Sequence, residues 1–292
     1  PVYYLVVILC LFVVPFVFDL SFLGINLYDE KFILKAVFLF LVAPNVLRVF
    51  SPNMVGGNQL WSIGVEEQFY LVWPVLFRWF IKRLLTFLLV FIALKFLITA
   101  ALELALQAQP GLVLSAVTRF WILLKVEQMA IGALGAWCLF YRKEKMMRFM
   151  YHRVTWYASV IALVALLFLP THHWLINYPE AVVFLLVIVN LSTNPDIRIS
   201  MEHPVLIKLG NISYGIYMYH TLCITVCIYA LSYFSLEKTN LVLFNILLYV
   251  SSALLTIIVA HFSYTYFEKI FLNMKEKFMI VKSGKSSRAK QS

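Results

Sequence analysis

Long apolar blocks constrain the fold of this chain more than any other feature of its sequence. A helix needs about 17 to 25 apolar residues to cross a bilayer. Only 13% of the 292 residues are charged, against about 25% in an ordinary soluble domain. The blocks are continuous, whereas transmembrane β-strands give short alternating runs. We therefore predict an all-α, polytopic α-helical membrane protein with candidate segments at 3–18, 32–49, 64–81, 84–106, 117–141, 154–169, 180–193, 212–233 and 241–271.

Basic residues are grouped, and their positions predict how the chain crosses the membrane. Loops rich in Lys and Arg remain on the cytoplasmic side. Even numbers of predicted segments separate the groups, so all of them fit on that side. The groups are Lys82 and Arg83; Arg142, Lys143, Lys145, Arg148 and Arg153; and Lys275, Lys277, Lys282, Lys285, Arg288 and Lys290. We expect residues 1–274 to form one membrane domain and residues 275–292 to form a basic cytoplasmic tail.

The net charge of +10 does not by itself indicate a nucleic-acid partner. The tail VKSGKSSRAKQS has no aromatic residue for stacking on a base, and it follows a predicted span directly. Attraction to anionic lipid headgroups explains a basic run at this position. We therefore expect the lipid bilayer as a partner, and no nucleic acid.

Cysteine and histidine show no pattern typical of a metal site. The four cysteines lie inside apolar segments. Cys223 and Cys227 share a helical face, yet no second pair of ligands accompanies them. His172 and His173 follow Pro170 in a short loop, where exposure explains them. We expect buried apolar cysteines and no bound metal.

Two adjacent carboxylates stand in the stretch LWSIGVEEQFYLVWP, residues 60–74. An ionisable side chain at membrane depth costs about 2.5–3.5 kcal/mol, which makes it a functional hypothesis. On a helix, Glu66 shares a face with Tyr70 and Trp73, whereas Glu67 points about 100° away. Ser62 is placed to cap the helix. The alternative is a charged helix start at the level of the headgroups.

A second polar group lies in LGNISYGIYMYH, residues 209–220. Ser213, Tyr217 and His220 share one helical face at spacings typical of a helix, and Tyr214 lies beside them. A neutral imidazole at this position can act as a general base on a hydroxyl. The alternative is a hydrogen-bonded histidine in an interfacial aromatic belt.

Other ionisable residues lie within predicted spans. Glu127 needs a partner, but Lys125 is badly placed on the same helix and Arg119 is two turns away. Glu268 ends the last span next to Lys269, which predicts a simple membrane boundary.

Four stretches, in order, closely resemble motifs of the acyltransferase-3 family of integral membrane O-acyltransferases. LWSIGVEEQFYLVWPVL is similar to the family motif. TRFWILLKVEQMAIGALGAW resembles its Arg-containing span, LGNISYGIYMYH its Ser-Tyr to His motif, and SYTYFEKIF its closing Tyr-x-x-x-Glu pattern. Together they extend from Leu60 to Phe271.

The resemblance implies an activity and its substrates. Family members move an acyl group, often acetyl, from cytoplasmic acyl-CoA to a hydroxyl of a surface carbohydrate or lipid-linked glycan, such as lipopolysaccharide O-antigen. It therefore implies O-acetylation with acetyl-CoA as the donor, no tightly bound cofactor, and a multi-pass protein of the cytoplasmic (inner) membrane with its C-terminus inside. The acyl group and the acceptor stay open.

The resemblance also implies missing parts. Similar proteins begin with two further helices that carry an Arg and a His, and none precedes Pro1. We expect an N-terminally truncated chain whose catalytic machinery is incomplete. The family has about ten spans, whereas two added helices give eleven here. We therefore expect eight spanning helices and one re-entrant segment, 64–81.

Candidate roles follow from these motifs. We expect Glu66, Glu67 and His220 to be catalytic, with a carboxylate orienting the base and His220 in support. The expected substrate-binding residues are Trp61, Ser62, Tyr70, Arg119, Ser213, Tyr214 and Tyr217. The competing hypothesis is a proton-coupled transporter or flippase, in which Glu66, Glu127 and His220 relay protons without covalent chemistry. A non-catalytic scaffold is a third.

Overall fold

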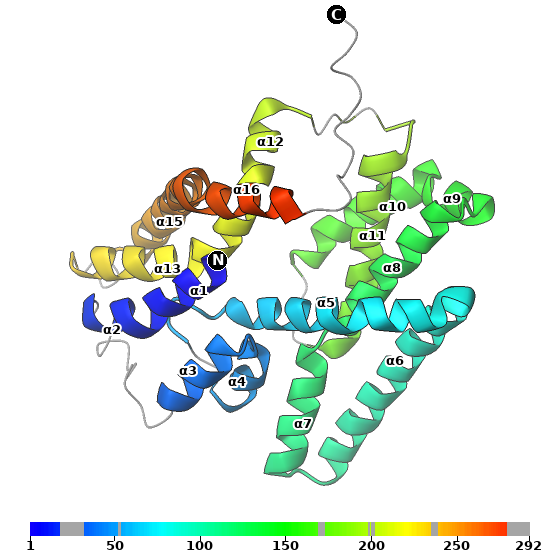
Figure 1. The fold of residues 1–292 in the computed structure, drawn as a ribbon, viewed down its shortest axis with the longest axis horizontal. Helices are drawn as coiled ribbons and strands as arrows, with labels where there is room; N and C mark the ends of the chain where they lie inside the picture. The colour runs from blue at the N-terminus through cyan, green and yellow to red at the C-terminus, as the bar shows by residue number, and fades with distance from the viewer. Residues whose placement is uncertain are drawn as a thin grey trace, which may run out of the picture. The chain divides into compact units, whose positions relative to one another are not determined.

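The computed structural model describes residues 1–17, 32–51, 54–168, 173–197, 199, 202–234 and 239–278, and in these ranges it contains helices and turns without a strand (Figure 1). The predicted all-α fold is therefore confirmed. His172 and residues 279–292 of the predicted tail lie outside the described residues. The helices divide into two compact units, which we describe separately.

Among the described residues, five helical stretches are long and apolar enough to cross a membrane. They are Leu60–Ala108, Leu112–Phe140, Trp174–Thr193, Ser213–Ser232 and Leu241–Met274. Helices α9 (Glu144–Met150) and α10 (Arg153–Leu166) are bent by 55° and add a sixth if they form one span. This number differs from the expected eight for two reasons. The stretch Leu60–Ala108 contains two predicted segments, 64–81 and 84–106. Other apolar blocks form short helices: residues 32–50 are divided between α3 (Phe32–Phe40) and α4 (Pro44–Phe50).

The predicted re-entrant segment is a continuous helix. Helix α5 runs from Leu60 to Phe80 and is not interrupted at Pro74. Its 21 residues give a length of about 31 Å, enough for the hydrocarbon core of a bilayer. Among the described residues, one helix pair, α9 and α10, is bent in the way that suits a broken or re-entrant span.

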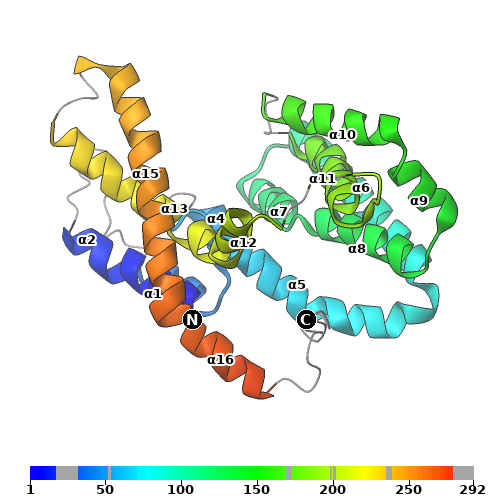
Figure 2. The same ribbon diagram turned by 90° about the horizontal axis from the view of Figure 1, so that it is seen from above.

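The first unit comprises residues 1–41, 53–60 and 203–292. Its centre is the pair α13 (Ser213–Ser232) and α15 (Leu241–Ser263), which lie side by side in Figures 1 and 2. Gly215 permits this approach, since a Cβ there would lie 3.1 Å from the Cβ of Ala260. The other helices are α1 (Val2–Ile8), α2 (Val14–Val17), α3, α12 (Pro204–Asn211) and α16 (Lys269–Phe278), with π-helical turns at Leu9–Val13 and Tyr264–Glu268.

The second unit comprises residues 42–52 and 61–202. It contains α4, α5, α6 (Leu84–Ala108), α7 (Leu112–Leu123), α8 (Val126–Phe140), α9, α10 and α11 (Asn177–Thr193), with 3-10 turns at Ile81–Arg83 and Trp174–Ile176. Trp73 of α5 packs against Phe69, Phe87 and Phe91, which joins α5 to α6 through aromatic contacts. Helix α11 packs on both α8 and α10 (Figure 2).

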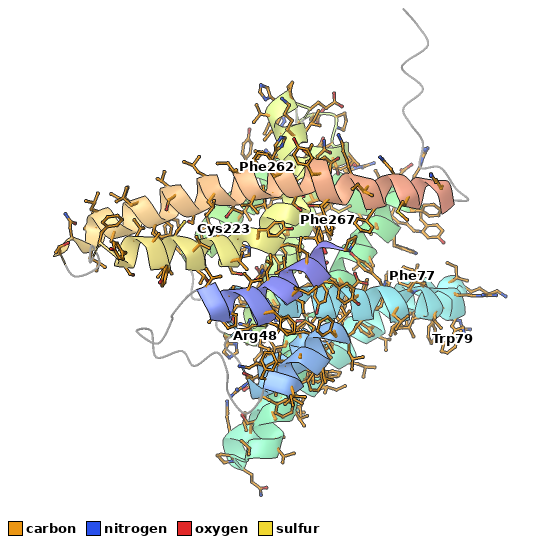
Figure 3. The ribbon with its side chains drawn as sticks, turned by 60° about the vertical axis from the view of Figure 1, so that its left-hand side comes forward. Arg48, Phe77, Trp79, Cys223, Phe262 and Phe267 are labelled. Atoms are coloured by element: carbon orange, nitrogen blue, oxygen red, sulfur yellow. The ribbon has the colours of Figure 1, made fainter. Side chains whose placement is uncertain are left out.

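The four cysteines are buried and unpaired, as their apolar neighbours predict. Cys223, labelled in Figure 3, lies on α13. Within the described ranges, no group of three or more His, Cys, Asp or Glu side chains is arranged to hold a metal ion.

Candidate functional site

The two adjacent carboxylates have different surroundings on α5. Glu66 is partly buried, Glu67 is exposed, and Tyr70 is 61% exposed. Neither glutamate forms a salt bridge within the part of the chain that the structure describes. The predicted cap at Ser62 is wrong, because turn residues 55–59 lead directly into a helix that begins at Leu60. Both carboxylates therefore lie in the second turn of the helix rather than the first.

Helix α4 packs against the acidic part of α5 through an amide pair. Asn45 Nδ2 donates to Gln68 Oε1 at 2.9 Å, and Gln68 Nε2 donates to Asn45 Oδ1 at 3.0 Å. Gly64 lies opposite, where a Cβ would be 2.8 Å from Pro44 Cδ. A reciprocal amide pair satisfies polar groups that would otherwise be unpaired in an apolar environment.

Two cationic side chains lie over the indole ring of Trp61, at the start of α5. The Arg48 guanidinium lies 5.1 Å from the centroid of the indole ring, and the Lys125 ammonium lies 5.9 Å from it. Arg48 belongs to α4, and Lys125 lies at the break between α7 and α8. Trp61 was an expected binding residue, but Arg48 was not, because Arg48 lies in the predicted segment 32–49 and no local spacing links it to Trp61, which lies outside the predicted segments.

A buried ion pair connects α6 to α8 and supplies the partner that Glu127 requires. Lys95 Nζ lies 3.7 Å from Glu127 Oε2, and both side chains are almost completely buried. Asn177 Nδ2 of α11 donates to Glu127 Oε1 at 3.1 Å. The sequence-based expectation for Glu127 named only Lys125 and Arg119 as partners and missed Lys95. An isolated lysine in an apolar 25-residue helix was the signal that could have found it.

In the first unit, residues 56–59, which precede α5, are hydrogen-bonded to α13. Gln59 Nε2 donates to the Met218 carbonyl at 2.7 Å, and Tyr217 OH donates to the Gln59 carbonyl at 3.2 Å. Thr221 Oγ1 lies within hydrogen-bond distance of two acceptors, the Gly56 carbonyl at 2.7 Å and Gln59 Oε1. Gly56 has a φ of 69°, a left-handed conformation that favours glycine.

His220 is half-buried on α13 and lies one turn from Tyr217. Its Nδ1 is 2.7 Å from the Tyr217 carbonyl, and the two rings are 5.7 Å apart. A carbonyl oxygen only accepts, so Nδ1 donates to it, and Nε2 is the ring nitrogen that accepts when the imidazole is in its neutral form. Ser213 is not brought to this pair, because its hydroxyl donates to the Gly210 carbonyl at 2.8 Å. Tyr214 is 42% exposed.

Glu268 is not a simple membrane boundary, contrary to the sequence-based expectation. It is buried in the π-helical turn Tyr264–Glu268. Ser263 Oγ donates to Glu268 Oε1 at 3.2 Å, and Tyr219 OH lies 2.9 Å from Ser263 Oγ. The π-helical turn carries the carboxylate inward, against α13, despite the neighbouring Lys269.

The expected site residues divide between the two units. Trp61, Ser62, Glu66, Glu67, Tyr70 and Arg119 belong to the second unit, and Ser213, Tyr214, Tyr217 and His220 belong to the first. Arg119 is exposed on α7. Each unit therefore contains its own polar group within apolar helices.

These features define a polytopic α-helical membrane protein with buried polar and charged side chains at membrane depth. The family model described as an acyltransferase domain, that of the acyltransferase-3 family, matches residues 1–262. The chain therefore belongs to this family, and the predicted resemblance is confirmed. Comparison with curated proteins and with solved structures gives no match.

Proposed function

We propose that this membrane acyltransferase moves an acyl group, most simply acetyl, from acyl-CoA to a hydroxyl of a cell-surface polysaccharide or glycolipid. The single observation that carries the proposal is the family match over residues 1–262. The partly buried Glu66 and the acceptor nitrogen of His220 support it, because acyl transfer to a hydroxyl needs groups that bind and move a proton.

The reaction forms one bond and breaks another. The acceptor hydroxyl loses its proton while its oxygen attacks the thioester carbonyl carbon. A C–O bond forms, the C–S bond breaks, and coenzyme A leaves as the thiol after taking up the proton. In this scheme Glu66 or Glu67 orients the base by a hydrogen bond, and His220 Nε2 supports proton movement.

The test compares the surface polysaccharide of cells with and without the complete gene. Ester-linked acyl groups are measured by proton NMR before and after mild base treatment. Loss of one base-labile signal on deletion, and its return on complementation, identifies the acyl group and supports the reaction. Unchanged spectra for every surface glycan, with an altered uptake of substrate, would instead favour a transporter.

A further inference from the structure

Trp61 lies at a point where two cations from other elements converge. Arg48 approaches its ring from α4, and Lys125 approaches it from the break between α7 and α8. All three side chains are only partly buried, so a ligand can reach them. Arginine and lysine side chains that converge in this way bind carboxylate and phosphate oxygens.

The packing of α4 fixes Arg48 at this point. From Asn45 to Arg48 the chain advances one turn along α4, while the opposing contacts move back along α5 from Gln68 to Trp61. The two helices are therefore antiparallel here, and the amide pair at one end sets the register of the guanidinium at the other. Figure 3 labels Arg48 on the short helix α4.

Lys125 is held in an unusual conformation. Its φ of 42° is left-handed, which is uncommon for a residue other than glycine and persists only where the surroundings impose it. The buried Lys95 contacts the chain on both sides of Lys125. Its ammonium donates to the Trp121 carbonyl at the end of α7, and it lies 3.7 Å from Glu127 in the first turn of α8.

Lys95 therefore bridges the two ends of a broken helix. The end of α7 carries partial negative charge on its free carbonyls, and the start of α8 is a favourable place for the Glu127 carboxylate. One ammonium between them stabilises the break, and the break turns Lys125 toward Trp61. Non-helical backbone at membrane depth occurs where it is buried in protein or lines a cavity, and the discontinuous helices of transporters form binding sites in this way.

We propose that Trp61, Arg48 and Lys125 form a binding site for the phosphate or diphosphate group of a substrate, with the Lys95–Glu127 pair as positioning residues. The guanidinium offers paired donors to phosphate oxygens, and the ammonium adds a point charge. This inference rests on the proposed function, in which both acyl-CoA and a lipid-linked acceptor carry such a group.

The test measures binding to the purified complete protein in nanodiscs of zwitterionic lipid. Coenzyme A, inorganic pyrophosphate and farnesyl diphosphate are titrated by calorimetry at low and at high salt. We expect Arg48→Gln and Lys125→Gln each to weaken binding about tenfold. The matched control is Lys143→Gln, which removes a cation 5.0 Å from the ring of Trp137 in the same unit and is expected to leave binding unchanged.

The probes separate the two sources of phosphate. Weaker binding of coenzyme A and pyrophosphate identifies the soluble donor, and weaker binding of farnesyl diphosphate alone identifies a lipid-linked acceptor. Lys125→Arg keeps the point charge and should bind within about threefold of the wild type, whereas Arg48→Lys loses the paired donors and should bind more weakly than the wild type. The site is refuted if the wild type binds none of the probes, if the glutamine variants bind normally, or if Lys125→Arg or Lys143→Gln weakens binding as much as the glutamine variants at Arg48 and Lys125.

The site and the proposed reaction can fail separately. A base-labile acyl signal that persists in cells while Arg48→Gln and Lys125→Gln bind every probe normally would overturn the phosphate site alone. Salt-sensitive binding that depends on both cations, without any acyl signal on a surface glycan, would overturn the proposed reaction alone.

Discussion

Glu66 and Glu67 are neighbours in the chain, but only one of them is partly buried. Glu66 therefore contacts the interior of the second unit, whereas Glu67 faces outward. We expect Glu66→Gln to reduce acyl transfer by about a hundredfold or more, since proton transfer by the base that Glu66 orients contributes about this much. Glu67→Gln should have a smaller effect. The measurement is the base-labile acyl content of the glycan in complemented cells.

Membrane insertion serves as the control for both glutamate variants. Glutamine is nearly isosteric with glutamate, so the amount of protein in the membrane fraction should equal that of the wild type. Full acyl transfer in both variants at equal protein amounts would exclude the carboxylates from the reaction.

The Lys95–Glu127 pair predicts a difference between single and double substitutions. Glu127→Gln leaves the ammonium of Lys95 buried without its counter-charge. Lys95→Met likewise leaves the carboxylate of Glu127 buried without its counter-charge. Each should lower the free energy of unfolding by about 3–5 kcal/mol. The double variant Lys95→Met/Glu127→Gln buries no charge and should recover most of this loss.

Thermal unfolding in detergent measures these changes. Lys145→Met, at an exposed position of α9, is the matched control and should leave the unfolding temperature unaltered. Additive losses in the double variant would show that the two side chains do not act as a pair. The double variant should recover stability but not binding. It should bind the phosphate probes more weakly than the wild type, because it lacks the Lys95 ammonium that bridges the break at Lys125.

At the scale of elements, two helical glycines of the second unit differ in the space around them. A Cβ at Gly64 would lie 2.8 Å from Pro44 Cδ and 2.9 Å from Asn45 Oδ1, whereas a Cβ at Gly132 meets nothing within 4 Å. Because the proline ring is rigid, Gly64→Ala should force α4 away from α5 and cost about 1–3 kcal/mol. Gly132→Ala should be neutral or stabilising by up to about 1 kcal/mol.

Parallel unfolding measurements on the two alanine variants test this prediction. Since α4 carries Arg48, Gly64→Ala should also weaken binding of pyrophosphate, and Gly132→Ala should not. Equal stability of the two variants would mean that α4 is not packed tightly on α5.

At the scale of the whole molecule, the sequence predicts the helices better than it predicts their contacts. Apolar blocks of bilayer length identify the fold class and most helices, because periodic burial is a local property. Contacts such as Lys95–Glu127 and Gln59–Thr221 join residues far apart in the chain. The left-handed break at Lys125 also has no local signal, since no Gly or Pro marks it. Such features depend on tertiary packing.

The last prediction concerns orientation in the membrane and uses helix α6. Its 25 residues from Leu84 to Ala108 give a length of about 38 Å, which exceeds the hydrocarbon core, so Lys82 and Gln109 must lie on opposite sides. Because basic loops stay inside, a membrane-impermeant maleimide should label Gln109→Cys in spheroplasts. Lys82→Cys and Lys145→Cys should react only after permeabilisation. The four native cysteines are buried, so the background should be low. Labelling of Lys82→Cys from outside would reverse the topology, and labelling of both ends of α6 from one side would show that it does not cross.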